Sequence, residues 1–165
     1  MNKELPNSAQ RVQAFLIENG FSCIVKELPE STRTAAEAAN AIGCEVAQIA
    51  KSLVFIDKES GNPILVVASG VNRVDTKKIE IATGFHLIKA DGKFVKEKMG
   101  FAIGGVPPIG HNETVMTFLD PTLKDYEQVW AAAGTPFAVF QLRSNELQTM
   151  TGGKFIDLKV DDGKN

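Results

Sequence analysis

Apolar positions near the N-terminus recur at the spacing of an α-helix. Val12, Phe15 and Leu16 share one helical face, Ser8 can cap the first turn, and Asn19-Gly20 can end the helix in a left-handed conformation. Further helices are expected where a capping residue precedes a short run of helix formers. These are Thr34 before residues 35–42, Asp75 before 76–82, Asp91 before 93–99 and Ser144 before 145–150, with one more helical turn over 45–50.

Runs of apolar and β-branched residues predict strands. Residues 51–57 and 64–68, joined by a turn over 59–63, are expected to form an antiparallel hairpin buried on both faces, with Lys51 at the junction between a helical turn and a strand. The other predicted strands are 22–27, 85–88, 114–120, 127–133, 137–142 and 155–160. Segment 127–133 is alanine-rich and could be helical, but we assign a strand because it can pair with 137–142. Interleaved helices, hairpins and crossovers predict a mixed α/β sheet or a partly closed barrel.

The length and composition of the chain predict one domain. With 165 residues, 44% of them hydrophobic, the chain can bury one well-packed core, so we expect a single domain over residues 1–165. No run approaches the roughly 20 apolar residues of a membrane-spanning helix, and the N-terminus lacks the apolar segment of a secretory signal. We therefore expect a soluble cytoplasmic protein with no membrane partner, in which Cys23 and Cys44 are buried thiols.

Charge is low overall but unevenly distributed. The net charge of −2 argues against a large nonspecific nucleic-acid surface and against a DNA partner, because such binding uses many Lys and Arg contacts to phosphate. Residues 73–98, however, hold seven Lys and Arg against four Asp and Glu, and so form a basic stretch. This basic stretch could meet a local anionic partner, or its lysines could simply lie on solvated helix faces.

Several common catalytic signatures are missing. His86 and His111 lie far apart and belong to no zinc-binding pattern, so no metal is predicted. The glycine- and proline-rich segment 100–110 matches neither the phosphate-loop nor the dinucleotide-binding pattern. A nucleophilic cysteine, Cys23 or Cys44 with a histidine, is a hypothesis that we rank last.

Segment 100–110 can nevertheless present bare backbone amides to a ligand, because glycine permits close approach and proline holds the chain in shape. It is a candidate oxyanion-binding loop, although a purely structural connector has a similar composition. Lys51 follows Val46 and Ile49 and leads into an apolar strand. Its charge is either solvated or aimed into a pocket, and periodicity does not distinguish the two.

Five motifs, in their order along the chain, resemble the YbaK/prolyl-tRNA synthetase-associated editing domain family. They are TRTAAEAANAIGCEVAQIAKSLVF over residues 32–55, VVASGVNRVDTKK over 66–78, GGVPPIGH over 104–111, AAAGTP over 131–136 and TGG over 151–153. The most specific are Lys51 and the G-x-x-x-P motif from Gly104 to Pro108. The resemblance covers nearly the whole chain, and it is to freestanding members because no synthetase catalytic or anticodon-binding region fits in 165 residues.

This resemblance implies an α+β fold with a mixed, mainly antiparallel, barrel-like sheet surrounded by helices. It also implies hydrolysis of amino acids wrongly attached to tRNA, typically cysteine or alanine on tRNA for proline, with prolyl-tRNA synthetase as a candidate partner in a ternary complex. Because the aminoacyl ester is already reactive, an enzyme need only position it and stabilise the charge that develops on its carbonyl oxygen. In such family members the free hydroxyl of the terminal ribose helps to activate the attacking water, so no cofactor is expected.

The resemblance also implies roles for individual residues. Lys51 would orient the substrate through its carbonyl or terminal phosphate, and the Gly104 amide, with Gly105 nearby, would hold the developing oxyanion. The implied substrate-binding residues are Thr32, Thr34, Ser69, Asp75, Gly105, Pro108 and His111. Thr34 and Asp75 fit helix caps equally well, Pro108 fits a turn, and His111, which only some branches share, fits a surface loop. The basic stretch becomes a candidate surface for the acceptor stem.

Two other functions remain open. A noncatalytic module could use the same pocket to hold a tRNA end or a free amino acid, and it would retain the ester that an editing enzyme cleaves. A thiol-dependent hydrolase would lose activity when Cys23 or Cys44 is replaced by alanine. The sequence does not determine the removed amino acid, the tRNA or the oligomeric state.

Overall fold

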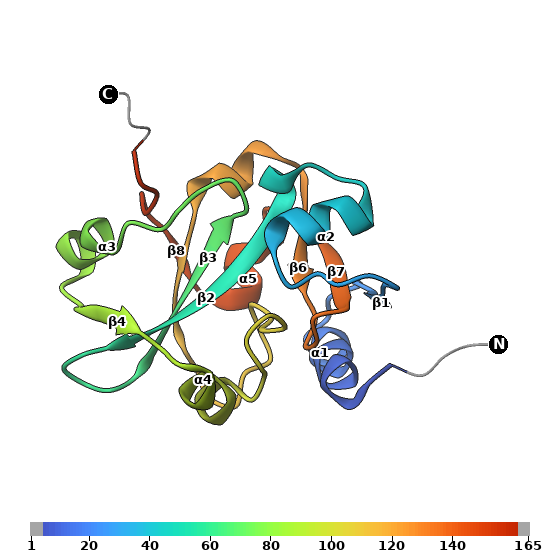
Figure 1. Ribbon diagram of the computed structural model, residues 1–165, viewed down its shortest axis with the longest axis horizontal. Coiled ribbons are helices and arrows are strands. Elements are labelled where there is room, and N and C mark those ends of the chain that lie inside the picture. The colour runs from blue at the N-terminus through green and yellow to red at the C-terminus, as the bar shows by residue number, and fades with distance from the viewer. Residues whose placement is uncertain (1–4, 162–165) are drawn as a thin grey trace.

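The computed structural model describes residues 5–161, which form a mixed eight-stranded sheet with helices on both faces (Figure 1). The strands are β1 (Val25–Glu27), β2 (Ile49–Asp57), β3 (Pro63–Ser69), β4 (Leu87–Lys89), β5 (Met116–Leu119), β6 (Gln128–Ala132), β7 (Ala138–Arg143) and β8 (Lys154–Phe155). The helices are α1 (Asn7–Glu18), α2 (Ala35–Ile42), α3 (Thr76–Thr83), α4 (Gly92–Met99) and α5 (Glu146–Thr151), with 3₁₀ turns η1 (Val46–Gln48) and η2 (Pro121–Asp125).

The sheet is open, so the barrel-like closure expected from the sequence is not seen within residues 5–161. The strands run in the order β1-β7-β6-β2-β3-β5-β8, and β4 adds a second pairing to β2. The edge strands β1 and β8 are three and two residues long. A barrel needs its two edges to pair over several residues, and strands this short offer almost no ladder for that. Antiparallel pairs outnumber parallel pairs by only four to three in the part of the chain described.

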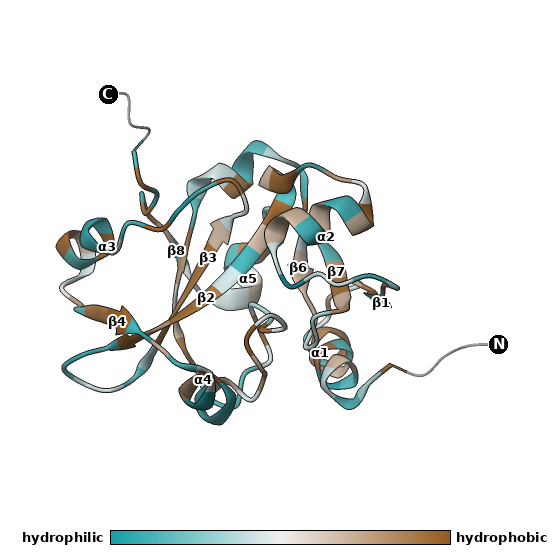
Figure 2. Ribbon diagram, in the orientation of Figure 1, coloured by the Kyte–Doolittle hydropathy of each residue, from teal (hydrophilic) through white to brown (hydrophobic). Residues whose placement is uncertain are grey.

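Different helices cover the two faces of the sheet, because side chains alternate along each strand. Leu65 and Val67 of β3 belong to the largest core cluster, to which α1, α4 and α5 also contribute. Val66 and Ala68 point to the other face and pack with Ile79 of α3. α2 covers this second face over β6 and the start of β2. β3 is buried along its whole length, and Figure 2 shows that its residues are mostly hydrophobic.

Short polar side chains begin three helices as predicted. Thr34 accepts a hydrogen bond from the N–H of Glu37, Asp75 accepts from Lys77 and Lys78, and Asp91 accepts from Phe94. Left-handed glycines end these helices, and also α5. Among residues 5–161 no helix combines the length and the apolar character that a membrane-spanning segment requires.

The predicted caps Ser8 and Ser144 are wrong. α1 begins directly after Pro6, whose missing N–H costs nothing at that position, and this leaves Ser8 inside the first turn. The hydroxyl of Ser144 donates instead to the carbonyl of Tyr126, which lies just before β6. A tertiary partner has therefore taken the side chain that the sequence assigned to the helix.

The hairpin of β2 and β3 is confirmed, but two expectations about it are wrong. β2 begins at Ile49, so Lys51 is the third residue of the strand and not a junction residue. Most of β2 is only half-buried, whereas burial on both faces was expected. The reason is that β2 has a continuous neighbour on one edge only.

The assignment of 127–133 as a strand is confirmed by β6, while the predicted last strand is reduced to β8 and an isolated bridge between Val74 and Lys159.

Gly105 lies where no side chain fits, in the loop formed by residues 100–115. A Cβ atom at Gly105 would lie 2.7 Å from the Cα atom of Thr135, in the turn between β6 and β7. The Gly105 carbonyl also accepts a 2.8 Å hydrogen bond from the N–H of Gly134. These contacts attach the loop to the β6–β7 turn.

We expect Gly105→Ala to lower the free energy of unfolding by about 1–3 kcal/mol, because the Thr135 backbone must move to admit a methyl group. Urea denaturation followed by circular dichroism measures the loss. Gly92→Ala is the matched control, since its Cβ would approach only the Ile103 Cδ1 atom, at 3.9 Å. Equal stability of the two variants would contradict the close contact.

Candidate functional site

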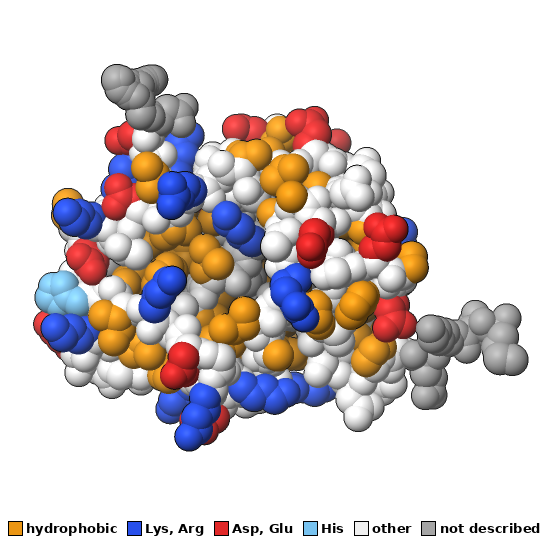
Figure 3. All heavy atoms as spheres, in the orientation of Figure 1, with side chains coloured by type: hydrophobic (Ala, Val, Ile, Leu, Met, Phe, Trp, Pro, Cys, Tyr) orange, Lys and Arg blue, Asp and Glu red, His pale blue; other side chains and the backbone are white. Residues whose placement is uncertain are grey.

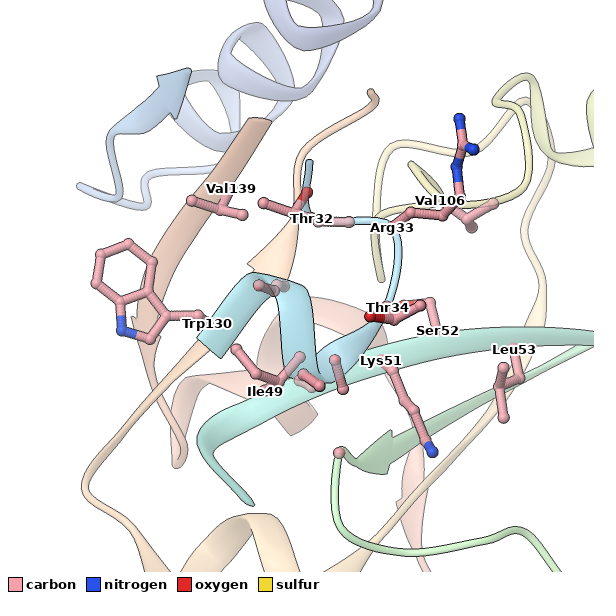
Figure 4. A pocket seen from close by; sticks show the side chains of 18 of the residues that line it. Thr32, Arg33, Thr34, Ile49, Lys51, Ser52, Leu53, Val106, Trp130 and Val139 are labelled. Atoms are coloured by element: carbon pink, nitrogen blue, oxygen red, sulfur yellow. The ribbon is translucent and has the colours of Figure 1, made fainter. Parts of the chain in front are cut away.

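A cavity of about 490 Å³ opens between α2, the first half of β2, loop 100–115 and the β6–β7 hairpin (Figure 4). Most of its wall is apolar. Polar side chains on the wall come from the segment before α2 and from β2, and they are Thr32, Arg33, Thr34, Lys51 and Ser52. A largely apolar cavity with a few converging polar groups is the usual form of a small-molecule or cofactor site.

The cavity lies beside an interruption in the pairing of β2. On one edge β2 pairs with β3 from Ala50 to Ile56. On the other edge the pairing with β6 ends at Ala50 and the pairing with β4 begins at Phe55. No described strand pairs with this second edge over residues 51–54, which we call the open edge. The backbone there is available to a ligand.

At the open edge, the side chains of Lys51 and Ser52 point to opposite sides of β2, as Figure 4 shows. Lys51 faces the side of α2 and α3, because it is paired with Ala68 of β3, which packs on that side. Ser52 faces the side of the largest core cluster, as do Ala50 and Val54 two residues away. The cavity therefore surrounds the edge of the strand.

The Lys51 ammonium is a partly desolvated cation. Burial lowers the pKa of Lys51, the neighbouring Asp120 carboxylate opposes this change, and the Arg73 guanidinium adds to it. Lys51 forms no ion pair with any residue that the structure describes. A partly desolvated cation is stabilised when it binds an anion or a polarised oxygen.

Gly104 lies at the third position of a turn in which the N–H of Gly105 donates to the carbonyl of Ala102 at 3.0 Å. Its φ of +94° is the left-handed value that a type II turn requires there, which favours glycine. Arg33 lies over this turn, since a Cβ at Gly104 would be 3.2 Å from the Arg33 Cγ atom. The turn occupies the N–H of Gly105, so Gly104 is the better candidate for a donor to a ligand.

Thr32 and Thr34 shape the cavity wall through backbone contacts. Thr32 is buried, and both its N–H and its hydroxyl donate to the carbonyl of Pro136, at 2.6 and 2.9 Å. Thr34 caps α2. Together they attach the start of α2 to the β6–β7 turn, across the cavity from β2.

The structure thus brings four of the nine predicted site residues, Lys51, Gly104, Thr32 and Thr34, to one cavity. The other five do not line it. Ser69 is fully buried, and its hydroxyl donates to the carbonyl of Ala47. Asp75 caps α3, and Gly105 packs on Thr135.

Pro108 and His111 line a separate, smaller cavity of about 290 Å³. The Nε2 atom of His111 lies 2.7 Å from the carbonyl of Pro107, so the neutral ring can donate a hydrogen bond to it. The His111 ring packs against Phe101 in a T-shaped arrangement, and the Arg11 guanidinium lies 4.4 Å from the centroid of the Phe101 ring. Burial lowers the pKa of His111. These contacts brace the loop that carries Gly104.

The cavity residues that were not singled out from the sequence include Arg33, Ser52 and Trp130. Arg33 belongs to a polar run that is typical of an exposed loop, and Trp130 belongs to a strand assigned on pairing alone. Ser52 carried a usable signal, because its hydroxyl stands next to Lys51 and directly before the apolar run 53–56.

The cysteines and the basic stretch are placed away from the cavity. Both cysteines are free thiols outside its lining; Cys23 is buried as expected, whereas Cys44 is only partly buried. Desolvation raises the pKa of both thiols, which disfavours the nucleophilic thiolate. In the basic stretch Lys78 is paired with Asp157 and Asp161, at 3.0 and 2.7 Å. Figure 3 shows Lys and Arg side chains spaced around an apolar area between α2 and α3. No group of His, Cys, Asp or Glu within residues 5–161 is arranged to hold a metal ion.

Comparison with known proteins gives consistent matches. Residues 29–150 match the family model described as the aminoacyl-tRNA editing domain. The chain is 35% identical to the uncharacterized protein YwhH of Bacillus subtilis (strain 168) over 138 residues, 83% of this chain and 87% of that protein. It is 26% identical over 130 residues to the "Putative Cys-tRNA(Pro)/Cys-tRNA(Cys) deacylase EbsC" of Enterococcus faecalis (strain ATCC 700802 / V583), 78% of this chain and 79% of that one.

A solved structure is more similar still. The crystal structure of a "putative trans-editing enzyme for prolyl tRNA synthetase" superposes with a TM-score of 0.90 at 49% sequence identity. The match covers 96% of this chain and 100% of that one. The similarity therefore includes the elements that surround the cavity.

We expect the stability of the protein to fall as the pH drops below the ordinary histidine pKa of about 6.5, and His111→Gln to reduce this fall. Burial lowers the pKa of His111, so the unfolded chain takes up a proton at a higher pH than the folded chain and is favoured in that window. Glutamine keeps a donor for the Pro107 carbonyl but does not titrate. Urea denaturation between pH 5 and pH 8 tests this, and identical pH profiles for the two proteins would contradict it.

Proposed function

Because this chain belongs to the aminoacyl-tRNA editing domain family, we propose that it hydrolyses the ester bond of wrongly charged aminoacyl-tRNA. The proposed substrate is tRNA for proline that carries a small wrong amino acid such as cysteine or alanine. The names of the Enterococcus faecalis relative and of the solved trans-editing structure support this choice. Residues 1–165 would act in trans in the cytoplasm, as a single editing domain.

One observation carries the proposal: Lys51 and Gly104 line the same cavity, although 53 positions separate them in the sequence. At one apolar site, a backbone donor can stabilise the developing oxyanion and a cation can anchor an anionic part of the substrate, which suits ester hydrolysis without a nucleophilic side chain. Neither cysteine lies on the cavity wall, which argues against the thiol-dependent alternative.

The proposed reaction uses one water molecule. Its oxygen attacks the carbonyl carbon of the aminoacyl ester, and the carbonyl oxygen becomes negatively charged. The Gly104 N–H donates a hydrogen bond to this oxyanion. The bond between the carbonyl carbon and the ribose oxygen then breaks, a proton passes to the ribose oxygen, and free amino acid and uncharged tRNA leave. The chain supplies position and electrostatic stabilisation, while the adjacent ribose hydroxyl would help to activate the water.

Lys51 would hold the terminal nucleotide. Its side chain points away from Thr32 and Arg33, toward the outer side of β2 (Figure 4). This direction supports a contact with the terminal phosphate more than a contact with the scissile carbonyl. Arg33, which lies over the Gly104 turn, is a second cation at the same cavity. The exposed part of the basic stretch would then face the acceptor stem, and prolyl-tRNA synthetase could hold the rest of the tRNA.

We expect Lys51→Ala to lower kcat/KM for deacylation by roughly 10- to 100-fold, the cost of losing a hydrogen bond to a charged group. Folding should stay intact, because the substitution removes a partly desolvated charge that has no ion-pair partner. The assay follows release of radiolabelled amino acid from a panel of mischarged tRNAs. Lys58→Ala, an exposed lysine directly after β2, is the matched control.

The same panel separates hydrolysis from binding. A noncatalytic module would bind the charged tRNA and leave every ester intact, and this result would refute the proposed function. Full activity of Lys51→Ala on a genuine substrate would remove Lys51 from the mechanism but leave the function standing.

We expect Gly104→Ala to lower deacylation by about tenfold or more, because alanine disfavours a φ of +94° and its methyl group meets Arg33. Gly61→Ala is the matched control for backbone strain. Gly61 has a φ of +76° and no atom within 4 Å of an added Cβ, and it lies in the β2–β3 turn. If both variants lose stability equally and both retain full activity, the Gly104 amide is not the oxyanion donor.

A further inference from the structure

Ser52 is the only side chain within residues 5–161 that has a buried polar atom with no hydrogen-bond partner. An unsatisfied buried hydroxyl costs roughly 1–3 kcal/mol, so a protein that keeps one usually has a use for it. Ser52 lies on the cavity wall. The missing partner is therefore a candidate ligand group.

The backbone of Ser52 adds to the polarity of the same place. The carbonyl of Ile49 accepts from the N–H of Gly70, so odd-numbered residues of β2 direct their backbone groups toward β3. Backbone direction alternates along a strand, and Ser52 therefore directs its N–H and C=O toward the open edge. No described strand pairs there. The N–H and C=O of Ser52 thus face the cavity without a partner from the sheet, and the unsatisfied hydroxyl of the same residue lies next to them.

Ser52 faces the inner part of the cavity. Val106 and Ala131, which also line the cavity, belong to the core cluster on the Ser52 side of the sheet. Lys51, which would hold the phosphate, lies on the opposite side of β2, whereas Arg33 lies beside Val106 (Figure 4). With the phosphate at Lys51 and the ester at Gly104, the group that reaches Ser52 is the side chain of the amino acid.

The Ser52 hydroxyl can turn toward that side chain at little cost. Its oxygen is covered in the present rotamer, while the residue as a whole is partly exposed. No hydrogen bond holds the oxygen in this position, and rotation about the Cα–Cβ bond gives two other staggered positions. Ligand binding would select the position in which the hydroxyl is satisfied.

We propose that Ser52 determines specificity by hydrogen bonding to a hydroxyl on the aminoacyl side chain, so that among small amino acids serine is released faster than alanine. This inference rests on the proposed function and names the class of amino acid removed. A site that is built to bond a substrate hydroxyl disfavours the analogue that lacks it, because its own polar group then stays unpaired. Cysteine should be intermediate, since a thiol is a weak hydrogen-bonding group. Alanine should be the poorest of the three.

The test measures single-turnover deacylation of tRNA for proline charged with serine, cysteine or alanine. For the unmodified protein we expect serine to be released about tenfold or more faster than alanine. Ser52→Ala should slow release of serine by about tenfold or more and leave release of alanine within about twofold. Ser52→Thr, which keeps the hydroxyl on a β-branched side chain suited to a strand, should retain the preference for serine over alanine.

Ser60→Ala is the matched control. The Ser60 hydroxyl donates to Asp57 at 2.7 Å, outside the cavity lining, so its loss should lower stability without changing the ratio of serine to alanine release. Ser52→Ala should not lower the free energy of unfolding, because no hydrogen bond is lost. A drop of more than about 1 kcal/mol would show that the hydroxyl has a structural partner, and would overturn the inference.

The outcomes distinguish this inference from the proposed function. Alanine released as fast as serine, or Ser52→Ala slowing both equally, refutes the role of Ser52 but leaves editing intact. Equal slowing would indicate that the hydroxyl contacts the terminal ribose. If none of the three esters is cleaved, the proposed function itself fails, and the specificity fails with it.

Discussion

The structure depends on one constraint: β2 must pair with two different strands on the same edge. β6 occupies the start of this edge in parallel orientation, and β4 occupies the end in antiparallel orientation. Neither reaches the open edge between them. β3 pairs continuously with the other edge, so β2 stays a regular strand even where its second edge has no paired strand. A gap in a sheet that is otherwise continuous gives a ligand access to backbone and side chains together.

The gap becomes a cavity because separate segments enclose it. Thr32 attaches the start of α2 to Pro136, and Gly105 attaches loop 100–115 to the neighbouring Thr135. Both attachments end on the turn between β6 and β7. His111 and Arg11 brace the far part of the loop through Pro107 and Gly100. The position of Gly104 relative to the open edge is therefore set by backbone contacts, which leave the cavity wall free for recognition.

Lys51 and Ser52 are adjacent in sequence but face different surroundings, because successive side chains of a strand point to opposite sides of the sheet. Lys51 presents charge on the outer side of β2, and Ser52 presents a hydroxyl on the inner side. This division suits a substrate with an anionic end and a small acyl end. It also explains why the cavity keeps an unpaired charge and an unpaired hydroxyl, which weaken the fold but are available to a ligand.

The sequence by itself determined most helices and strands, because caps, glycine stops and hydrophobic runs are local signals. Thr34, Asp75, Asp91 and the β2–β3 hairpin follow from them. The sequence motifs also identified the family and singled out Lys51 and Gly104, which meet at one cavity.

Only the tertiary structure decided what lies around these residues. Ser144 donates to the carbonyl of Tyr126 and does not cap α5, and the sheet stayed open because its edge strands are short. Pro108 and His111 follow Gly104 closely in sequence but line another cavity, since the loop turns away. The role proposed for Ser52 depends on its position at the open edge. Pairing between distant strands creates such an edge, and no local pattern of residues encodes it.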